Sequence, residues 1–227
     1  MLTTVNNFDL IKNHLTFDSP DDFYFVQVIV RGKDGRINNV DGGTINSSNK
    51  NRMVRIWTIR SLDEFEHAKY DMISIANSVG GRVYIYPTKR SFKDVARETL
   101  RLVTDIYLSE NYDGMKMAYS SACGISYNKK DKKFVVDIDW ENFDDDINNC
   151  IYKDRNDVLN NIKTFIDTQC EPFEKDSAES KIFYEVPTLH GIHLITKSFN
   201  IQKFKVRFPK IDVHKNNPTL LYFTSNN

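Results

Sequence analysis

Two aspartates separated by one residue lie at the end of an apolar stretch near the middle of the sequence. Asp137 and Asp139 belong to the run Phe134–Trp140, whose β-branched and aromatic residues are typical of a buried strand. Side chains at positions i and i+2 of a strand project from the same face, so we expect both carboxylates to point the same way. Two adjacent like charges there need compensation by a divalent cation, a basic side chain or a shared proton. The pair therefore suggests a metal site, although an isolated Asp-x-Asp pair more often marks only the solvated end of a strand.

A histidine and a third aspartate follow in apolar surroundings. His193 lies in the stretch 189–196 after a turn that contains Gly191, and Asp212 lies between two β-branched residues. A single histidine on an apolar strand is more often a core residue than a functional one. Carboxylate oxygens, however, are the hard ligands that Mg²⁺ and Mn²⁺ prefer. Together, three carboxylates and a histidine fit metal-dependent chemistry at a phosphate, either nucleotidyl transfer or phosphodiester hydrolysis.

A basic pair at the start of a predicted helix is a second candidate site. Lys89 and Arg90 follow a short strand expected at 83–86 and precede Ser91, the expected N-cap of a helix that ends at about Leu108. Cations beside the free backbone N–H groups of a helix N-terminus suit a phosphate. An ordinary solvated turn fits these residues equally well.

The elements that must position these residues are predicted from hydrophobic periodicity and turn residues. In the N-terminal half we expect a helix at 5–15, antiparallel strands at 23–30 and 53–59 joined by a flexible tract at 38–51, a helix at 62–79 with a capping box at Ser61–Glu64, a strand at 83–86 and a helix at 91–108. In the C-terminal half we expect strands at 132–140, 181–186, 189–196 and 219–224, an acidic turn at 141–146, and helices at 155–170 and 199–208. This order predicts an α/β (α+β) fold, in which an N-terminal α/β module, residues 1–125, packs on a C-terminal RRM-like catalytic unit, residues 126–227.

Two acidic motifs and one histidine motif follow one another in this sequence. In type and order they resemble the motifs of the archaeo-eukaryotic primase superfamily, and more closely those of small phage and plasmid primase–polymerase-like proteins. Phe134–Asp139 is similar to the first motif, Thr188–His193 to the second and Ile211–Asp212 to the third. The resemblance covers the C-terminal half by motif order rather than by extended identity. It departs at Gly191, where the family often has serine or threonine, so that Thr188 would be the displaced equivalent. No zinc-ligand cluster and no helicase module is present in the sequence.

The resemblance implies a two-metal nucleotidyltransferase that adds an NTP or dNTP to a nucleic-acid 3′-hydroxyl on a template. It implies that Asp137, Asp139 and Asp212 are catalytic and bind Mg²⁺ or Mn²⁺, and that His193 contacts the phosphates of the nucleotide. The other residues that we expect to contact the nucleotide are Thr188, Gly191, Lys197, Lys215, Lys89 and Arg90. The expected partners are nucleoside triphosphates, single-stranded or primer–template nucleic acid, and other replication proteins.

Three other functions remain open on the sequence. A metal-dependent nuclease would use the same carboxylates and histidine. A replication-initiator endonuclease would also have an RRM-like fold, but His190 and His193 are spaced so that on one strand they would face opposite sides. A non-catalytic primase-like module would bind nucleic acid while tolerating the loss of a carboxylate. Because all three acids are present, we favour catalysis.

Composition and charge bear on the possible partners of the protein and on its location. The 227 residues carry 31 Lys and Arg against 31 Asp and Glu, so the net charge neither favours nor excludes a polyanionic partner. Cations concentrate in 1–60 and 80–101 and acids in 137–146, a pattern that could give a basic groove facing an acidic centre.

No apolar run approaches the ~20 residues of a membrane span, and the N-terminus has no signal-peptide pattern. We therefore expect no membrane partner and a cytoplasmic location, the host cytoplasm if the protein is phage-encoded. The three cysteines form no paired motif and are expected to be free thiols.

Overall fold

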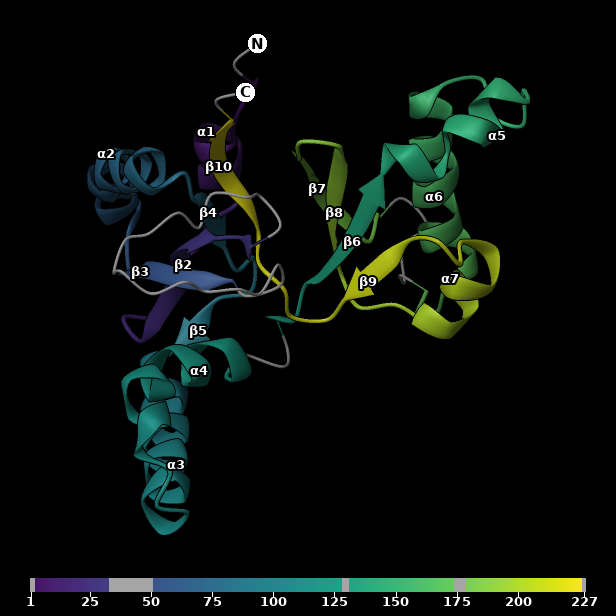
Figure 1. Cartoon of the computed structure of the whole chain (residues 1–227). Helices are drawn as coiled ribbons and strands as arrows, with labels where there is room; N and C mark the ends of the chain where they lie inside the picture. Colours follow the sequence, from purple (N-terminus) through teal and green to yellow (C-terminus); the bar gives the residue numbers. More distant parts are fainter. Residues whose placement is uncertain (1–2, 33–50, 128–130, 174–178, 226–227) are drawn as a thin grey trace. The chain divides into compact units, whose positions relative to one another are not determined.

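The chain forms two units of mixed α/β structure. The computed structural model describes residues 3–32, 51–127, 131–173 and 179–225 (Figure 1). Unit 1 comprises Met1–Asp131 together with Pro218–Asn227, and unit 2 comprises Lys132–Asn217. The tract predicted to be flexible, 38–51, lies outside the described residues except for its last position. The mixed α/β class predicted from the sequence is confirmed, with one antiparallel sheet in each unit.

Unit 1 is built on a sheet in which the strands follow the order β1-β10-β4-β2-β3, with β5 paired to β2. Its strands are β1 (Thr3–Asn6), β2 (Asp22–Val30), β3 (Arg52–Ile59), β4 (Arg82–Ile85), β5 (Arg90–Ser91) and β10 (Thr219–Ser225). The antiparallel pairing of β2 with β3 is as predicted. The position of β10 differs from the prediction, which assigned 219–224 to the C-terminal unit. The strand instead pairs with β1 and β4 of unit 1. The prediction missed this pairing because both partners lie far away in the chain and no local pattern identifies them.

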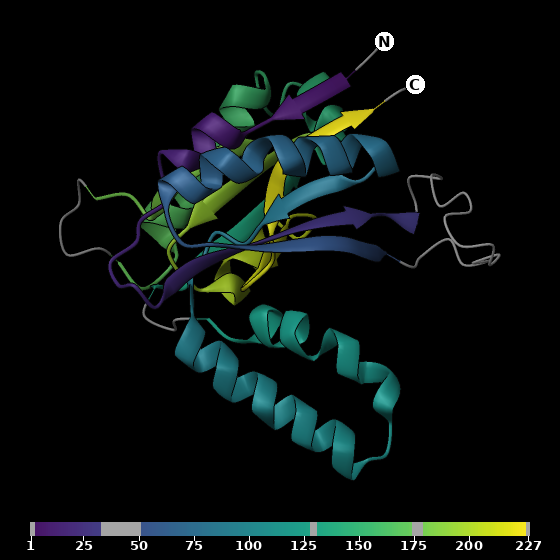
Figure 2. The same cartoon turned by 90° about the vertical axis from the view of Figure 1, so that its left-hand side faces the viewer.

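Serine N-caps mark the start of the two long helices of unit 1 in the sequence. The helices of this unit are α1 (Phe8–Lys12), α2 (Leu62–Val79), α3 (Phe92–Leu108) and α4 (Ala118–Ile125), with a 3₁₀ segment η2 (Tyr112–Met117) before α4. Ser61 caps α2 by accepting a hydrogen bond from the backbone N–H of Glu64, and Gly80 ends this helix at a φ of 61°. The helix expected at 5–15 is only α1, since β1 takes its start. Figure 2 shows α2 along one face of the sheet, and α3 antiparallel to η2 and α4 in a helical hairpin.

Unit 2 contains a four-stranded antiparallel sheet in the order β7-β8-β6-β9. Its strands are β6 (Phe134–Asp139), β7 (Ile182–Pro187), β8 (Gly191–Thr196) and β9 (Asp212–His214), and its helices are α5 (Asp144–Asn148), α6 (Arg155–Gln169) and α7 (Ile201–Arg207). The acidic turn expected at 141–146 is instead largely helical, since the 3₁₀ segment η4 (Trp140–Asn142) leads into α5. Figure 1 shows α6 and α7 on the same side of this sheet.

The hydrophobic core of unit 2 decides which side chains of β6 face the helices. Val136 and Ile138 are fully buried in one cluster with Ile162 of α6 and Phe204 of α7. Because side chains alternate along a strand, Asp137 and the residues two positions before and after it lie on the opposite face. The carboxylates of β6 are therefore on the face of the sheet away from α6 and α7.

Among the helices that the structure describes, none combines the length and the apolar character of a membrane span. All three cysteines are free thiols, as predicted, with Cys123 and Cys170 buried and Cys150 exposed.

Candidate functional site

The sheet of unit 2 brings the three sequence motifs together. Asp137 on β6 lies directly opposite His193 on β8 and also directly opposite Asp212 on β9. Residues that face each other in neighbouring strands project from the same side of the sheet. Asp139 lies two positions beyond Asp137 and is therefore on that side too. We call these four residues, His193, Asp137, Asp139 and Asp212, the carboxylate row.

Two members of the carboxylate row contact each other directly. The Nε2 atom of His193 lies 3.2 Å from Oδ1 of Asp137. The His193 side chain is 13% exposed and that of Asp137 is 33% exposed, so a ligand could reach the carboxylate more easily than the ring. A histidine held by a carboxylate has a fixed ring orientation, which is useful for a residue that must contact a ligand.

Asp212 is the most exposed member of the row and has a cationic partner that the sequence analysis did not find. Its side chain is 71% exposed, and Nζ of Lys205 on α7 lies 3.0 Å from its Oδ1 atom. Lys205 belongs to no recognisable motif. Because Asp212 begins the edge strand β9, Lys205 of α7 reaches its carboxylate at the edge of the sheet. The sequence alone offered no way to select this lysine from the others.

Asp139 lies in the most strongly acidic part of the site. Burial raises the pKa of its carboxyl group, and the neighbouring charges of Asp137 and Glu141 raise it further. His193 and His190 act in the opposite direction. The raised pKa means that the native structure disfavours the ionised form of this carboxyl group. An additional positive charge nearby would therefore stabilise the ionised form.

Gly191 is required by the close approach of β8 to β6. It lies opposite Asp139, and a Cβ atom at this position would be 1.8 Å from the carbonyl oxygen of Ile138. No side chain fits at that distance, so this position requires glycine. Thr188 lies in the same turn, where its backbone N–H donates to the carbonyl of Gly191 over 3.0 Å. Gly191 thus lies opposite Asp139, and Thr188 lies in the turn that precedes Gly191.

The two predicted lysines of unit 2 lie away from the centre of the row. Lys197 directly follows the end of β8 opposite to Gly191, and its Nζ atom lies 3.0 Å from Oε1 of Glu179. Its expected contact with the nucleotide is therefore not supported by its position. Lys215 is exposed and follows β9, three residues after Asp212.

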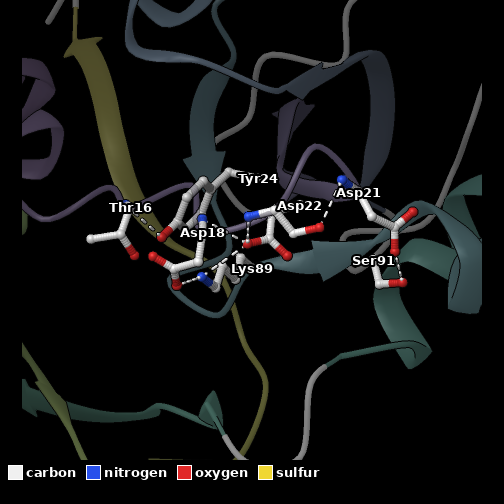
Figure 3. Close-up of polar contacts among 8 residues, drawn as sticks. Thr16, Asp18, Asp21, Asp22, Tyr24, Lys89 and Ser91 are labelled. Carbon is white, nitrogen blue, oxygen red and sulfur yellow. Dashed lines mark hydrogen bonds and ion pairs between the residues drawn. The ribbon is translucent and has the colours of Figure 1, made fainter.

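Lys89 and Arg90 form internal contacts of unit 1. Figure 3 shows Lys89 directed at the carboxylates of Asp18 and Asp22, with its Nζ atom 3.0 Å from Oδ2 of Asp22. Arg90 donates from Nε to the carbonyl of Cys123 over 2.7 Å, and burial lowers its pKa to about 10. The two residues are only 5% and 1% exposed. These contacts assign both cations to the interior of unit 1 rather than to a phosphate at its surface, and they correct the predicted role.

The donor atoms of the carboxylate row suit a hard divalent cation, but the ligands are not gathered around one point. Among the residues that the structure describes, no group of three or more His, Cys, Asp or Glu side chains is arranged to hold a metal ion. Burial, and after it the neighbouring charge of Asp137, raise the pKa of Asp139. Mg²⁺ and Mn²⁺ bind oxygen ligands and often keep several waters, so one or two carboxylates can be sufficient for each ion. The residues present therefore fit such an ion chemically.

Comparison with known proteins adds no relative. No protein-family model matches the chain, and no match was found among the curated proteins or among the solved structures. The arguments for a function consequently come from the carboxylate row and its surroundings.

Proposed function

We propose that unit 2 is a primase–polymerase-like nucleotidyltransferase unit, which transfers a nucleotide from an NTP or dNTP to the 3′-hydroxyl of a nucleic acid. One observation carries the proposal: His193, Asp137 and Asp212 lie in a row across three neighbouring strands, with Asp139 next on the same face. The motifs that resemble the primase superfamily are therefore adjacent in space as well as ordered in sequence. The β-α-β-β-α-β order and the strand order β7-β8-β6-β9 further support an RRM-like unit.

Each member of the carboxylate row would have a distinct role in this reaction. Asp137, Asp139 and Asp212 would hold Mg²⁺ or Mn²⁺ through their oxygens. Such ions, when bound, activate the attacking hydroxyl and neutralise charge on the triphosphate. His193 is oriented by Asp137 and would contact the phosphates, which places the nucleotide for in-line attack. Gly191 keeps β8 close to β6, so the distance between His193 and the carboxylates stays short.

A non-catalytic nucleic-acid-binding module is the second candidate, and one observation favours it. Asp137 contacts His193 and Asp212 contacts Lys205, so two of the three carboxylates already have basic neighbours within the protein. A site in which basic side chains already contact these carboxylates can persist without a metal. This candidate predicts nucleic-acid binding that does not depend on divalent cations.

Nucleotide binding measured by calorimetry distinguishes the two candidates. The titrations use NTPs and dNTPs with Mn²⁺ on the wild type, on Asp137→Ala and on Asp145→Ala, a control that removes an exposed carboxylate of α5. We expect metal-dependent binding in the wild type and in Asp145→Ala, and its loss in Asp137→Ala. If the folded wild type binds single-stranded DNA but no nucleotide, the transferase proposal is wrong and the binding module is favoured.

A further inference from the structure

Lys205 contacts the carboxylate row from outside the sheet. Its Nζ atom lies 3.0 Å from Oδ1 of Asp212 and 3.4 Å from the carbonyl oxygen of Pro209. The helix that carries it is firmly placed, because the neighbouring Phe204 is fully buried in the core of unit 2. The Lys205 side chain is itself 35% exposed. A fixed backbone with a partly exposed, flexible side chain allows the ammonium group to move while the helix stays in place.

The ammonium group of Lys205 and a divalent cation at Asp212 would compete for the same oxygen. Both are cations, and a doubly charged ion attracts a carboxylate more strongly than a singly charged one at equal distance. An ion pair as exposed as this one contributes little to stability, so exchanging it costs little. Lysine also suits such an exchange because its ammonium is a compact, hydrated charge with rotatable donors on a flexible stem.

We propose that Lys205 is a positioning residue that holds Asp212 in the metal-free protein and moves to a phosphate of the nucleoside triphosphate when a divalent cation takes that carboxylate. The inference rests on the proposed function, since it needs both ligands. Its consequence is cooperative binding: the displaced ammonium finds a new anionic partner only when the triphosphate is present. The metal and the triphosphate therefore each strengthen binding of the other by the same factor.

Lys203 provides a matched control on the same helix. It lies two residues before Lys205, and its Nζ atom lies 3.2 Å from Oε1 of Glu171, which is outside the carboxylate row. Removing the charge of Lys203 changes the net charge of the unit by the same amount as removing that of Lys205. A general electrostatic effect would therefore appear in both variants, and competition at Asp212 only in one.

The experiment measures Mn²⁺ affinity from the electron paramagnetic resonance of free Mn²⁺, with and without a non-hydrolysable nucleoside triphosphate. The proteins are the wild type, Lys205→Met, Lys205→Gln and Lys203→Met, each checked for folding by circular dichroism. Without nucleotide, we expect both Lys205 variants to bind Mn²⁺ about two- to fivefold more tightly than the wild type, the range that corresponds to loss of an exposed ion pair. With nucleotide, we expect them to lose most of the further tightening that the wild type and Lys203→Met show.

The possible failures are distinguishable. If the wild type binds Mn²⁺ and nucleotide cooperatively but folded Lys205→Met and Lys205→Gln match it in both measurements, the role of Lys205 is overturned and the proposed function stands. Equal tightening in Lys203→Met would also overturn it, because the effect would then be general. If the wild type binds neither Mn²⁺ nor nucleotide, the proposed function fails and this inference fails with it.

Discussion

We call Lys89, Asp18 and Asp22 of unit 1 the Lys89 cluster. This cluster and the carboxylate row of unit 2 balance their charges differently. In unit 1, Lys89 is buried between the carboxylates of Asp18 and Asp22, and the cation is part of the packing (Figure 3). In unit 2, Asp137 and Asp139 are neighbours on one strand, and the burial and repulsion that they experience raise the pKa of Asp139.

The difference shows how a structural group of charges can be told from a candidate site. Opposite charges that are buried together stabilise each other only in the native arrangement, and removing one of them leaves the other uncompensated. Like charges that are held together by a sheet disfavour the native arrangement and are tolerated where a ligand can compensate them. Mutations in unit 1 should therefore change stability, whereas mutations in the carboxylate row should change binding and activity.

The largest effect that we predict is on activity in unit 2. Asp139→Asn removes the charge to which the proposed function gives a metal-binding role, while keeping the shape of the side chain. We expect primer extension with Mn²⁺ to fall about 10³-fold, or about 4 kcal/mol in activation free energy. Asp145→Asn, which changes an exposed carboxylate of α5, should extend primers like the wild type. Primer extension by Asp139→Asn at the wild-type rate would remove this aspartate from the site.

The second prediction concerns the stability of unit 1. Lys89→Met leaves the carboxylate of Asp22, whose side chain is only 16% exposed, without the contact to Lys89. We expect the free energy of unfolding, measured with urea, to decrease by about 2–4 kcal/mol, somewhat less than for a pair that is fully buried. Lys93→Met is the control, since this exposed lysine of α3 should tolerate the change. An unchanged urea midpoint in Lys89→Met would show that the cluster is not structural.

The prediction of local structure from the sequence was mostly accurate where a pattern is local. The capping box at Ser61 and Glu64 marks the start of α2, and the apolar spacing in 155–170 marks α6. Three strands of unit 2, β6, β7 and β8, were also identified, whereas β9 was not predicted as a strand. What could not be predicted is strand register: only the ladders show that Asp137 faces both His193 and Asp212.

Charged side chains at turns were predicted less well, for a physical reason. Lysine and arginine are exposed in most proteins, so Lys89 and Arg90 suggested a surface site, although both are buried. The partners that bury them are distant in sequence, such as Asp18 and Cys123. Lys205 shows the reverse case: an ordinary helix lysine enters the site because the fold brings α7 to β9. Neither outcome follows from composition or spacing.

The third prediction tests whether the sheet itself holds the carboxylate row together. Gly191→Ala places a methyl group where the carbonyl of Ile138 lies, so β8 must move away from β6. We expect a loss of about 1–3 kcal/mol in the free energy of unfolding, typical of overpacking, and reduced nucleotide binding. Gly124→Ala in α4 is the control, because a Cβ atom there would be 3.9 Å from the nearest side-chain atom. Unchanged stability and binding in Gly191→Ala would mean that this close approach does not define the site.

The smallest predicted effect is on the pH dependence of stability, and it follows from the raised pKa of Asp139. Between the ordinary aspartate pKa of 3.8 and the raised value, the native protein binds more protons than the unfolded chain, so stability falls as pH rises through this window. Above the window Asp139 is ionised at a cost, and Asp139→Asn should have a slightly higher melting temperature than the wild type. Below pH 3.8 this difference should disappear, because the carboxyl group is then protonated in both states.

Melting temperatures measured with divalent cations test the same carboxylates. At neutral pH, Mg²⁺ or Mn²⁺ should raise the melting temperature of the wild type more than that of Asp139→Asn, because the added charge compensates the ionised carboxylates. Asp145→Asn should respond to both pH and metal like the wild type. If Asp139→Asn and the wild type melted at the same temperature across the whole pH range and gained equally from the metal, the carboxylates of β6 would be no more strained than the Lys89 cluster, and the contrast between the two units would lose its physical basis.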